Sequence, residues 1–93
     1  MTSVNVKFTG EIWERAKIPH TQFEFNGTTL ADLLRALFVQ YNLRDLVLDS
    51  HDQFIFRSGV LVNGRSAKYL GGLAAPIQDG DEVIVMRPSI GAM

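Results

Sequence analysis

One stripe of apolar residues limits most strongly what this chain can fold into. Six such residues recur at helical spacing between positions 30 and 41, at i, i+3, i+4, i+7, i+8 and i+11: Leu30, Leu33, Leu34, Leu37, Phe38 and Tyr41. Thr29 and Asp32 stand three residues apart, a weaker form of the capping box, with Thr28 as an alternative cap and Asn42 suited to the helix end. The sequence therefore predicts one main amphipathic helix, which can cover only one face of one sheet.

The segments on both sides of this helix carry strand patterns. Apolar residues alternate with polar ones at the start of the chain, and β-branched runs near its end predict a central strand that Pro88 terminates. Asn63-Gly64 is a strong hairpin-turn signal. We expect residues 10–20 to form a loop that includes one helical turn, and residues 43–48 a short helical segment. The predicted strands cover residues 4–8, 23–25, 54–56, 60–62 and 83–86.

The order of these elements predicts an α+β fold of the β-grasp, or ubiquitin-like, type. A mixed sheet of four or five strands would carry the main helix across one face, with the first and last strands as central neighbours. The 93 residues suffice for one core and disfavour a two-domain enzyme with a cleft between its domains. We expect a β-grasp domain over residues 1–88 and a flexible C-terminal tail over residues 89–93.

Composition excludes several classes of function. The net charge of −1 argues against a nucleic-acid partner. The lack of cysteine excludes a disulfide scaffold, a thiolate zinc site, an iron–sulfur cluster and a cysteine nucleophile. No apolar run approaches the length of a membrane span, and the N-terminus has no secretory pattern, so the expectation is a cytoplasmic domain without membrane contact.

Side chains that could carry chemistry are few, and we expect neither a metal nor another cofactor. His20 and His51 fall in separate polar loops, where solvation is favoured over metal binding. Asp79 and Asp81 flank Gly80, which favours a β-turn over a calcium site. Trp13 can anchor a partner, but packing at the core edge is favoured.

The tail after Pro88 is the remaining candidate for a reactive group. It holds no charged side chain and has small residues, so it can enter a narrow channel of a partner and offer a terminal carboxylate. An ordinary frayed terminus is the simpler alternative.

Several motifs together resemble the MoaD/ThiS family of ubiquitin-like sulfur-carrier proteins, over nearly the whole chain. The helix start is similar to the family's T-x-x-E-L-L pattern, and residues 60–64 resemble its V-x-V-N-G strand and turn. Residues 77–83, Ile-Gln-Asp-Gly-Asp-Glu-Val, resemble its L-x-D-G-D-E-V segment and are the most specific match. Gly71-Gly72-Leu73-Ala74 is similar to the branch that serves cysteine biosynthesis, and Pro88 with the tail resembles the P-x-x-G-G ending.

The resemblance implies a carrier or small accessory subunit that is not itself an enzyme. An E1-like adenylating enzyme, which binds the ATP, would activate the C-terminal glycine. Sulfur would then attack the acyl-adenylate to give a thiocarboxylate for a sulfur-accepting synthase in molybdopterin, thiazole or cysteine biosynthesis.

The ending departs from the Gly-Gly of the family. Gly91 stands where the first glycine would be, Ala92 where the terminal one would be, and Met93 follows. A methyl group at the reactive position adds bulk and restricts φ. Three alternatives remain open: a protease exposes Gly91, a tolerant partner accepts the altered tail, or the protein has lost transfer chemistry and acts as a non-conjugating interaction or regulatory subunit.

A partner surface can be predicted beside the tail. If Val83 and Val85 face the helix, Ile84 and Met86 face the opposite side of the sheet, where Leu61 would join them. Ordinary exposure of a few apolar residues is the alternative. Arg87 would either guide an acidic partner or be solvated.

Overall fold

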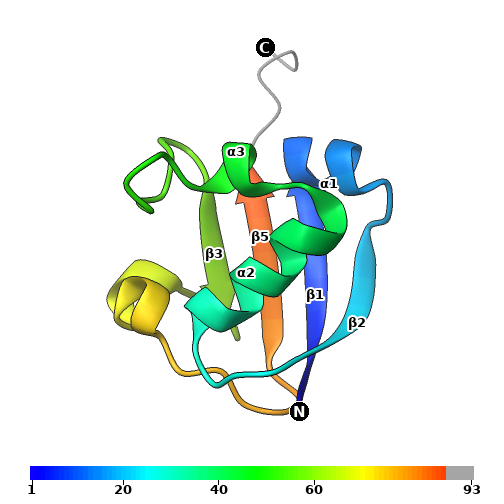
Figure 1. Ribbon diagram of the computed structural model, residues 1–93, viewed down its shortest axis with the longest axis vertical. Helices are drawn as coiled ribbons and strands as arrows, with labels where there is room; N and C mark the ends of the chain where they lie inside the picture. Colours follow the sequence, from blue (N-terminus) through cyan, green and yellow to red (C-terminus); the bar gives the residue numbers. More distant parts are fainter. Residues whose placement is uncertain (88–93) are drawn as a thin grey trace.

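The computed structural model describes residues 1–87, and these form one mixed sheet of five strands in the order β2-β1-β5-β3-β4 (Figure 1). The mixed sheet is as predicted, but its fifth strand is a two-residue edge strand at residues 65–66 and not the expected strand at residues 54–56. The strands are β1 (Thr2–Gly10), β2 (His20–Phe25), β3 (Gly59–Val62), β4 (Arg65–Ser66) and β5 (Glu82–Arg87).

The first and last strands are central neighbours, as predicted. β1 and β5 pair in parallel, with Val6 opposite Val83 and Phe8 opposite Val85. All the other strand pairs are antiparallel. The side chains of Val83 and Val85 are fully buried, so alternate residues of β5 point into the core.

One helix, α2 (Leu30–Tyr41), lies across one face of the sheet (Figure 1). Its bounds are those of the predicted stripe, and its start is a capping box. The Thr29 hydroxyl oxygen accepts a bond from the Asp32 N–H at 3.3 Å, while the Asp32 carboxylate accepts one from the Thr29 N–H at 3.3 Å. At the other end Asn42 adopts the left-handed conformation, with φ 55°.

The core fills the space between α2 and the sheet. Leucines of α2 meet valines of β1, β3 and β5, and the following short helix, α3 (Arg44–Val47), adds Val47. Two 3₁₀ turns, η1 (Ala67–Tyr69) and η2 (Gly72–Ala74), connect β4 to the segment before β5. The fully buried side chains are led by Ile12, Leu30, Leu33, Leu34, Leu37, Leu43, Val4 and Val6.

Three expectations of the sequence analysis are wrong. Residues 54–56 form no strand, because Arg57 has φ 72° and only Phe54 makes an isolated bridge, to Leu48. His20 begins β2 rather than lying in a loop. Trp13 is 51% exposed instead of packed at the core edge.

The position of Trp13 follows from a short helix, where a loop with one helical turn was expected. Residues 11–16 form α1 (Glu11–Ala16), which begins directly after β1. Ile12, the neighbour of Trp13, points inward and is completely buried, so the core position on this short helix is already occupied. Trp13 is thereby turned outward.

None of the helices found in residues 1–87 is long and apolar enough to cross a membrane.

Candidate functional site

The candidate site is the C-terminal end of β5, from which the predicted tail continues. Figure 1 shows this end of β5 on the same side of the molecule as α1 and α3. Gly91 and Ala92, the predicted sulfur-carrying residues, lie outside the described residues, as does the boundary expected between the domain at residues 1–88 and the tail at 89–93. The structure therefore describes the base of the tail, at Arg87.

Arg87 is held within the fold by two contacts. Its Nε lies 2.8 Å from the Glu11 carboxylate of α1, and its Nη1 donates to the Leu46 carbonyl of α3 at 3.2 Å. Only 19% of the Arg87 side chain and 28% of the Glu11 side chain are exposed. The last residue of β5 is thus tied to both neighbouring helices, which differs from simple solvation of Arg87.

A second arginine joins the same two helices to each other. Arg15 of α1 pairs with Asp45 of α3 at 2.9 Å, and its Nη1 also donates to the Asn42 carbonyl at 2.9 Å. The hydrogen bond between the Arg15 and Asp45 side chains is the main cause that lowers the pKa of Asp45, and the same bond raises the pKa of Arg15. The base of the tail consequently sits in a cross-linked frame of α1, α3 and β5.

These contacts were not predicted from the sequence. Arg87 and Leu46 are 41 residues apart, and Arg15 and Asp45 are 30 residues apart. Charged residues in loops and short helices carry no periodic signal that identifies their partners. The pairing becomes visible only when the sheet order is known, since that order brings the end of β5 beside α1.

The face of the sheet opposite α2 carries a stripe of three half-buried apolar residues, Leu61, Ile84 and Met86, which we call the open-face stripe. Leu61 lies directly opposite Ile84 across the β3–β5 pair. Met86 lies opposite Gly59, which has no side chain to cover it. The stripe leads along β5 to Arg87, as expected if Val83 and Val85 face the helix.

The rest of that face is polar. On the other side of β5, Lys7 lies opposite Ile84, and on β1 it also pairs with His20 of the edge strand β2. A shallow depression covers these strands, lined by Asn5, Val6, Lys7, His20, Thr21, Gln22, Glu82, Val83 and Ile84. The open face therefore has an apolar half over β5 and β3 and a polar half over β1 and β2.

The acidic segment before β5 is a turn, as predicted. The Asp79 carboxylate accepts a bond from the Ser3 N–H at 2.8 Å, and the Asp81 carboxylate accepts one from the Gln78 N–H at 2.8 Å. The Asn63 side chain also donates to Asp81, at 3.0 Å, which links this turn to the β3–β4 hairpin. Within residues 1–87 no group of three or more histidine, aspartate or glutamate side chains is placed to hold a metal ion.

Known proteins share this architecture. Small archaeal modifier protein 1 from Methanosarcina acetivorans superposes with a TM-score of 0.80 at 25% identity, over 95% of this chain and 94% of that one. Urm1 from Trypanosoma brucei gives a TM-score of 0.77 at 28% identity, over 97% and 95%. A chain of the BexX/CysO complex from Amycolatopsis orientalis shares the fold, with a TM-score of 0.78 at 18% identity over 94% and 96%.

The ubiquitin-like β-grasp prediction is thus confirmed. No curated protein is significantly similar to the sequence. The sequence profile of the ThiS family, in contrast, matches residues 6–91, which is nearly the whole chain. That match bears out the resemblance seen in the motifs, and the chain therefore belongs to the ThiS family.

Proposed function

We propose that this protein is a ubiquitin-like sulfur carrier whose reactive group is a carboxylate at the end of its tail. The observation that carries the proposal is the family match, which extends past the last strand and ends at Gly91. That glycine lies a few residues beyond Arg87, where the described fold ends. A short link of this kind would let a partner take up the tail while the folded domain stays outside its active site.

The chemistry takes place in two steps on partner enzymes. In an E1-like adenylating enzyme, the tail carboxylate attacks the α-phosphorus of ATP and pyrophosphate leaves, which gives an acyl-adenylate. A hydrosulfide equivalent then attacks the acyl carbon and AMP leaves, so that the tail ends in a thiocarboxylate. The carrier itself supplies the acyl group and no catalytic side chain, and a synthase then accepts the sulfur.

The open-face stripe is the surface that we assign to partner docking. Leu61, Ile84 and Met86 lie outside the buried core and are continuous with the base of the tail. Apolar burial there would align the carrier before the tail enters the active site. A chain with this fold occurs in the BexX/CysO complex, which supports partner docking as such.

Arg87 would act in this arrangement as a positioning residue. Its bonds to Glu11 and to the Leu46 carbonyl fix the end of β5 relative to α1 and α3. A fixed base reduces the number of directions in which the tail can leave the domain, and so lowers the entropy lost when it binds.

The test is the mass and the reactivity of three chains, ending at Gly91, at Ala92 and at Met93. Each is incubated with the cognate activating enzyme, ATP and sodium hydrosulfide as the sulfur source, and pyrophosphate exchange and intact mass are measured. Exchange by the Gly91 chain alone indicates processing, and exchange by all three indicates a tolerant partner. A mass change corresponding to replacement of oxygen by sulfur establishes the carrier step.

The outcome that contradicts the proposal is equally definite. No exchange by any of the three chains, together with a native protein that ends only in unmodified Met93, excludes sulfur transfer. If deletion of residues 91–93 then leaves partner binding intact while Met86→Asp abolishes it, the protein is a non-conjugating interaction or regulatory subunit.

A further inference from the structure

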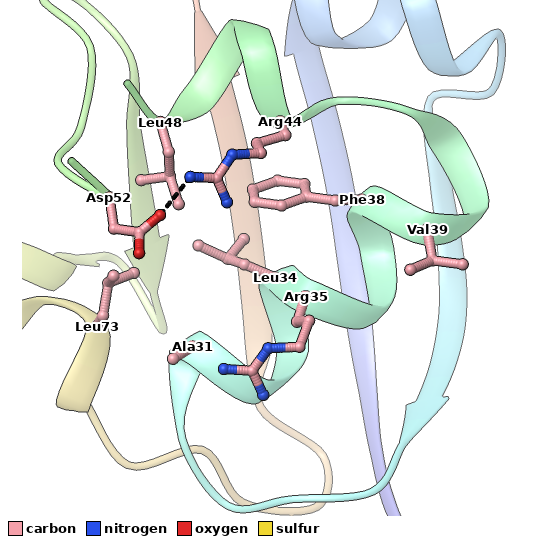
Figure 2. A pocket seen from close by; sticks show the side chains of 9 residues that line it. All are labelled: Ala31, Leu34, Arg35, Phe38, Val39, Arg44, Leu48, Asp52 and Leu73. Carbon is pink, nitrogen blue, oxygen red and sulfur yellow. Dashed lines mark hydrogen bonds and ion pairs between the residues drawn. The ribbon is translucent and has the colours of Figure 1, made fainter. Parts of the chain in front are cut away.

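A groove lies on the helix side of the molecule, away from the open-face stripe. Its walls come from α2, from α3 and the segment that follows it, and from η2. Figure 2 shows Leu34 and Phe38 of α2 on one side, with Leu48 and Leu73 on the other. The lining residues are Ala31, Leu34, Arg35, Phe38, Val39, Arg44, Leu48, Asp52 and Leu73. We call this site the α2 groove.

The groove is mainly apolar and is not covered by the described part of the chain. Val39, in the last turn of α2, is 85% exposed at a position where a polar residue would be the usual choice. Leu34 and Leu48 are buried at the floor, while Phe38 and Leu73 are only partly covered. Helix α2 therefore has a second apolar side, next to the one that packs on the sheet.

The charge of the groove is opposite in sign to that of the chain. Two arginines and one aspartate line it, which leaves one positive charge, whereas the whole chain has a net charge of −1. Arg44 is already paired with Asp52 at one end of the groove (Figure 2). Arg35 is different, because 75% of its side chain is exposed and, among residues 1–87, its one ion-pair partner is Asp32 at 3.5 Å.

Asp32 pairs with Arg35 through only one of its two carboxylate oxygens. Its Oδ2 accepts bonds from the N–H groups of Thr28 and Thr29 at 3.1 and 3.3 Å, and from the Thr29 hydroxyl at 3.0 Å. That oxygen is occupied by the helix cap, so only Oδ1 faces Arg35. Of the two arginines in this groove, Arg35 is therefore the one whose guanidinium can more readily bind a carboxylate of another molecule.

The shape of the groove favours a helix as its occupant. The cavity volume of about 340 Å³ lies near the lower limit of pockets that enclose small ligands, and its rim residues are widely exposed. The α2 backbone is satisfied by its own hydrogen bonds, so a strand cannot add to this wall and contacts must come from side chains. The stretch from Ala31 to Val39 spans about 12 Å, or roughly two helical turns.

We propose that the α2 groove binds an amphipathic helical segment of a partner protein, with apolar residues on one face and carboxylates at their edge. The apolar residues would cover Val39, Phe38 and Leu73, and a carboxylate would pair with Arg35. The α2 groove and the open-face stripe lie on opposite faces of the sheet. Such a partner can therefore bind without covering the open-face stripe, and this inference does not depend on the proposed function.

The test uses three synthetic helical peptides of about 15 residues, each stapled so that helix formation is not limiting. The first carries leucines at i, i+3, i+4 and i+7 with flanking glutamates. The second replaces the glutamates by lysines, and the third has the first composition in scrambled order. Each is titrated into ¹⁵N-labelled protein, and the amide shift changes give both the affinity and the binding surface.

We expect the acidic peptide to bind with a Kd below about 1 mM, with shift changes centred on Ala31, Val39 and Leu73. Val39→Asp should weaken binding at least tenfold, while Gln40→Asp, one residue along the same helix and outside the groove, should leave it unchanged. Arg35→Glu should weaken binding of the acidic peptide at least fivefold and strengthen binding of the lysine peptide.

Several results would overturn the inference. One is equal binding of the acidic and lysine peptides to the unaltered protein, and another is binding of the scrambled peptide. Shift changes at Ile84 and Met86 in place of the groove residues, or no saturable shift change with any peptide, would also contradict it. Dimerisation of the protein through the groove, seen by sedimentation without peptide, would assign the surface to a second copy. Val39→Asp should leave adenylation unchanged, so loss of groove binding is distinguishable from loss of carrier function.

Discussion

The Arg87 guanidinium and the Glu11 carboxylate form a mostly buried ion pair at 2.8 Å that joins the last residue of β5 to the first residue of α1. Since β1 runs directly into α1, this pair also connects the ends of the two central strands. The carbonyl of Leu46 accepts a further bond from Arg87 and brings in α3. The place where the tail begins is thus one of the most constrained points of the described fold.

Replacing Arg87 by alanine should therefore lower the free energy of unfolding by about 1–2 kcal/mol, because Glu11 and the Leu46 carbonyl lose a half-buried donor. Urea denaturation measures the effect. A double-mutant cycle with Glu11→Gln should show coupling, whereas Arg65→Ala, at an exposed position in the edge strand β4, should change stability by less than about 0.5 kcal/mol. Equal effects of the two arginine substitutions would contradict a structural role for the pair.

Gly27→Ala should be strongly destabilising. A Cβ atom at this position would lie 2.4 Å from the Asp32 Cβ, and Gly27 has φ 145°, which L side chains rarely adopt. Asp32 must then move, and the capping box of α2 is lost with it, so we expect a cost of at least about 2 kcal/mol. Thermal and urea unfolding both report this cost.

Gly59 offers a matched control for that substitution. A Cβ atom there would meet nothing within 4 Å. Gly59→Ala should therefore stay within about 0.5 kcal/mol of the unaltered protein. A small effect of Gly27→Ala, comparable to that of Gly59→Ala, would show that the α2 cap contributes little.

Stability should fall on acidification because of three carboxylates. The pKa of Asp32 is lowered from 3.8 chiefly by the Thr28 N–H, that of Asp45 by the Arg15 side chain, and that of Asp49 by the Gln53 N–H. A lowered pKa in the folded state means that the stabilisation is fully present above the unfolded value and is lost as the pH falls through the folded value. The free energy of unfolding should thus decrease between about pH 5 and pH 2.

Carboxyl NMR titration checks the origin of this effect. Asp32, Asp45 and Asp49 should each titrate below 3.8, and Asp32→Asn should reduce the slope of stability against pH. If all three titrate at or above 3.8, the acid sensitivity has another source.

Met86→Asp tests the open-face stripe. Met86 lies outside the buried core, so the domain should fold, as circular dichroism can verify. A charge in the docking stripe must be desolvated on binding, and we expect at least a tenfold loss in the rate of adenylation by the activating enzyme. Gln22→Asp, on the polar half of the same sheet face, should leave the rate of adenylation within twofold of that of the unaltered protein. Normal adenylation of Met86→Asp would place the docking surface elsewhere and leave the carrier chemistry intact.

The elements with strong periodicity were predictable, and those defined by single contacts were not. Helix α2 and the central strand β5 follow directly from apolar spacing, and Asn63-Gly64 correctly marks the β3–β4 hairpin. Residues 54–56 look like a strand, but the positive φ of Arg57 and the Asp49-capped turn before them hold the chain in another path. The strand propensity of three residues does not indicate the turns that form on both sides of them.

The same distinction applies to the candidate site. The inward position of Val83 and Val85 follows from strand alternation alone, and the open-face stripe follows from it. The contacts of Arg87 depend on where α1 and α3 pack, and α1 has too few residues for its apolar face to be recognised. The α2 groove depends on η2, whose position relative to α2 no sequence pattern indicates.

The parallel pairing of β1 with β5 has a consequence for biosynthesis. The two innermost strands come from opposite ends of the described chain, so their contacts are among the most distant in sequence that this fold contains. During translation, β1 and β2 can form a hairpin early, but the sheet has no centre until β5 has left the ribosome. The folded domain thus forms only late in synthesis, and a chain that lacks β5 has no assembled sheet for a partner to bind.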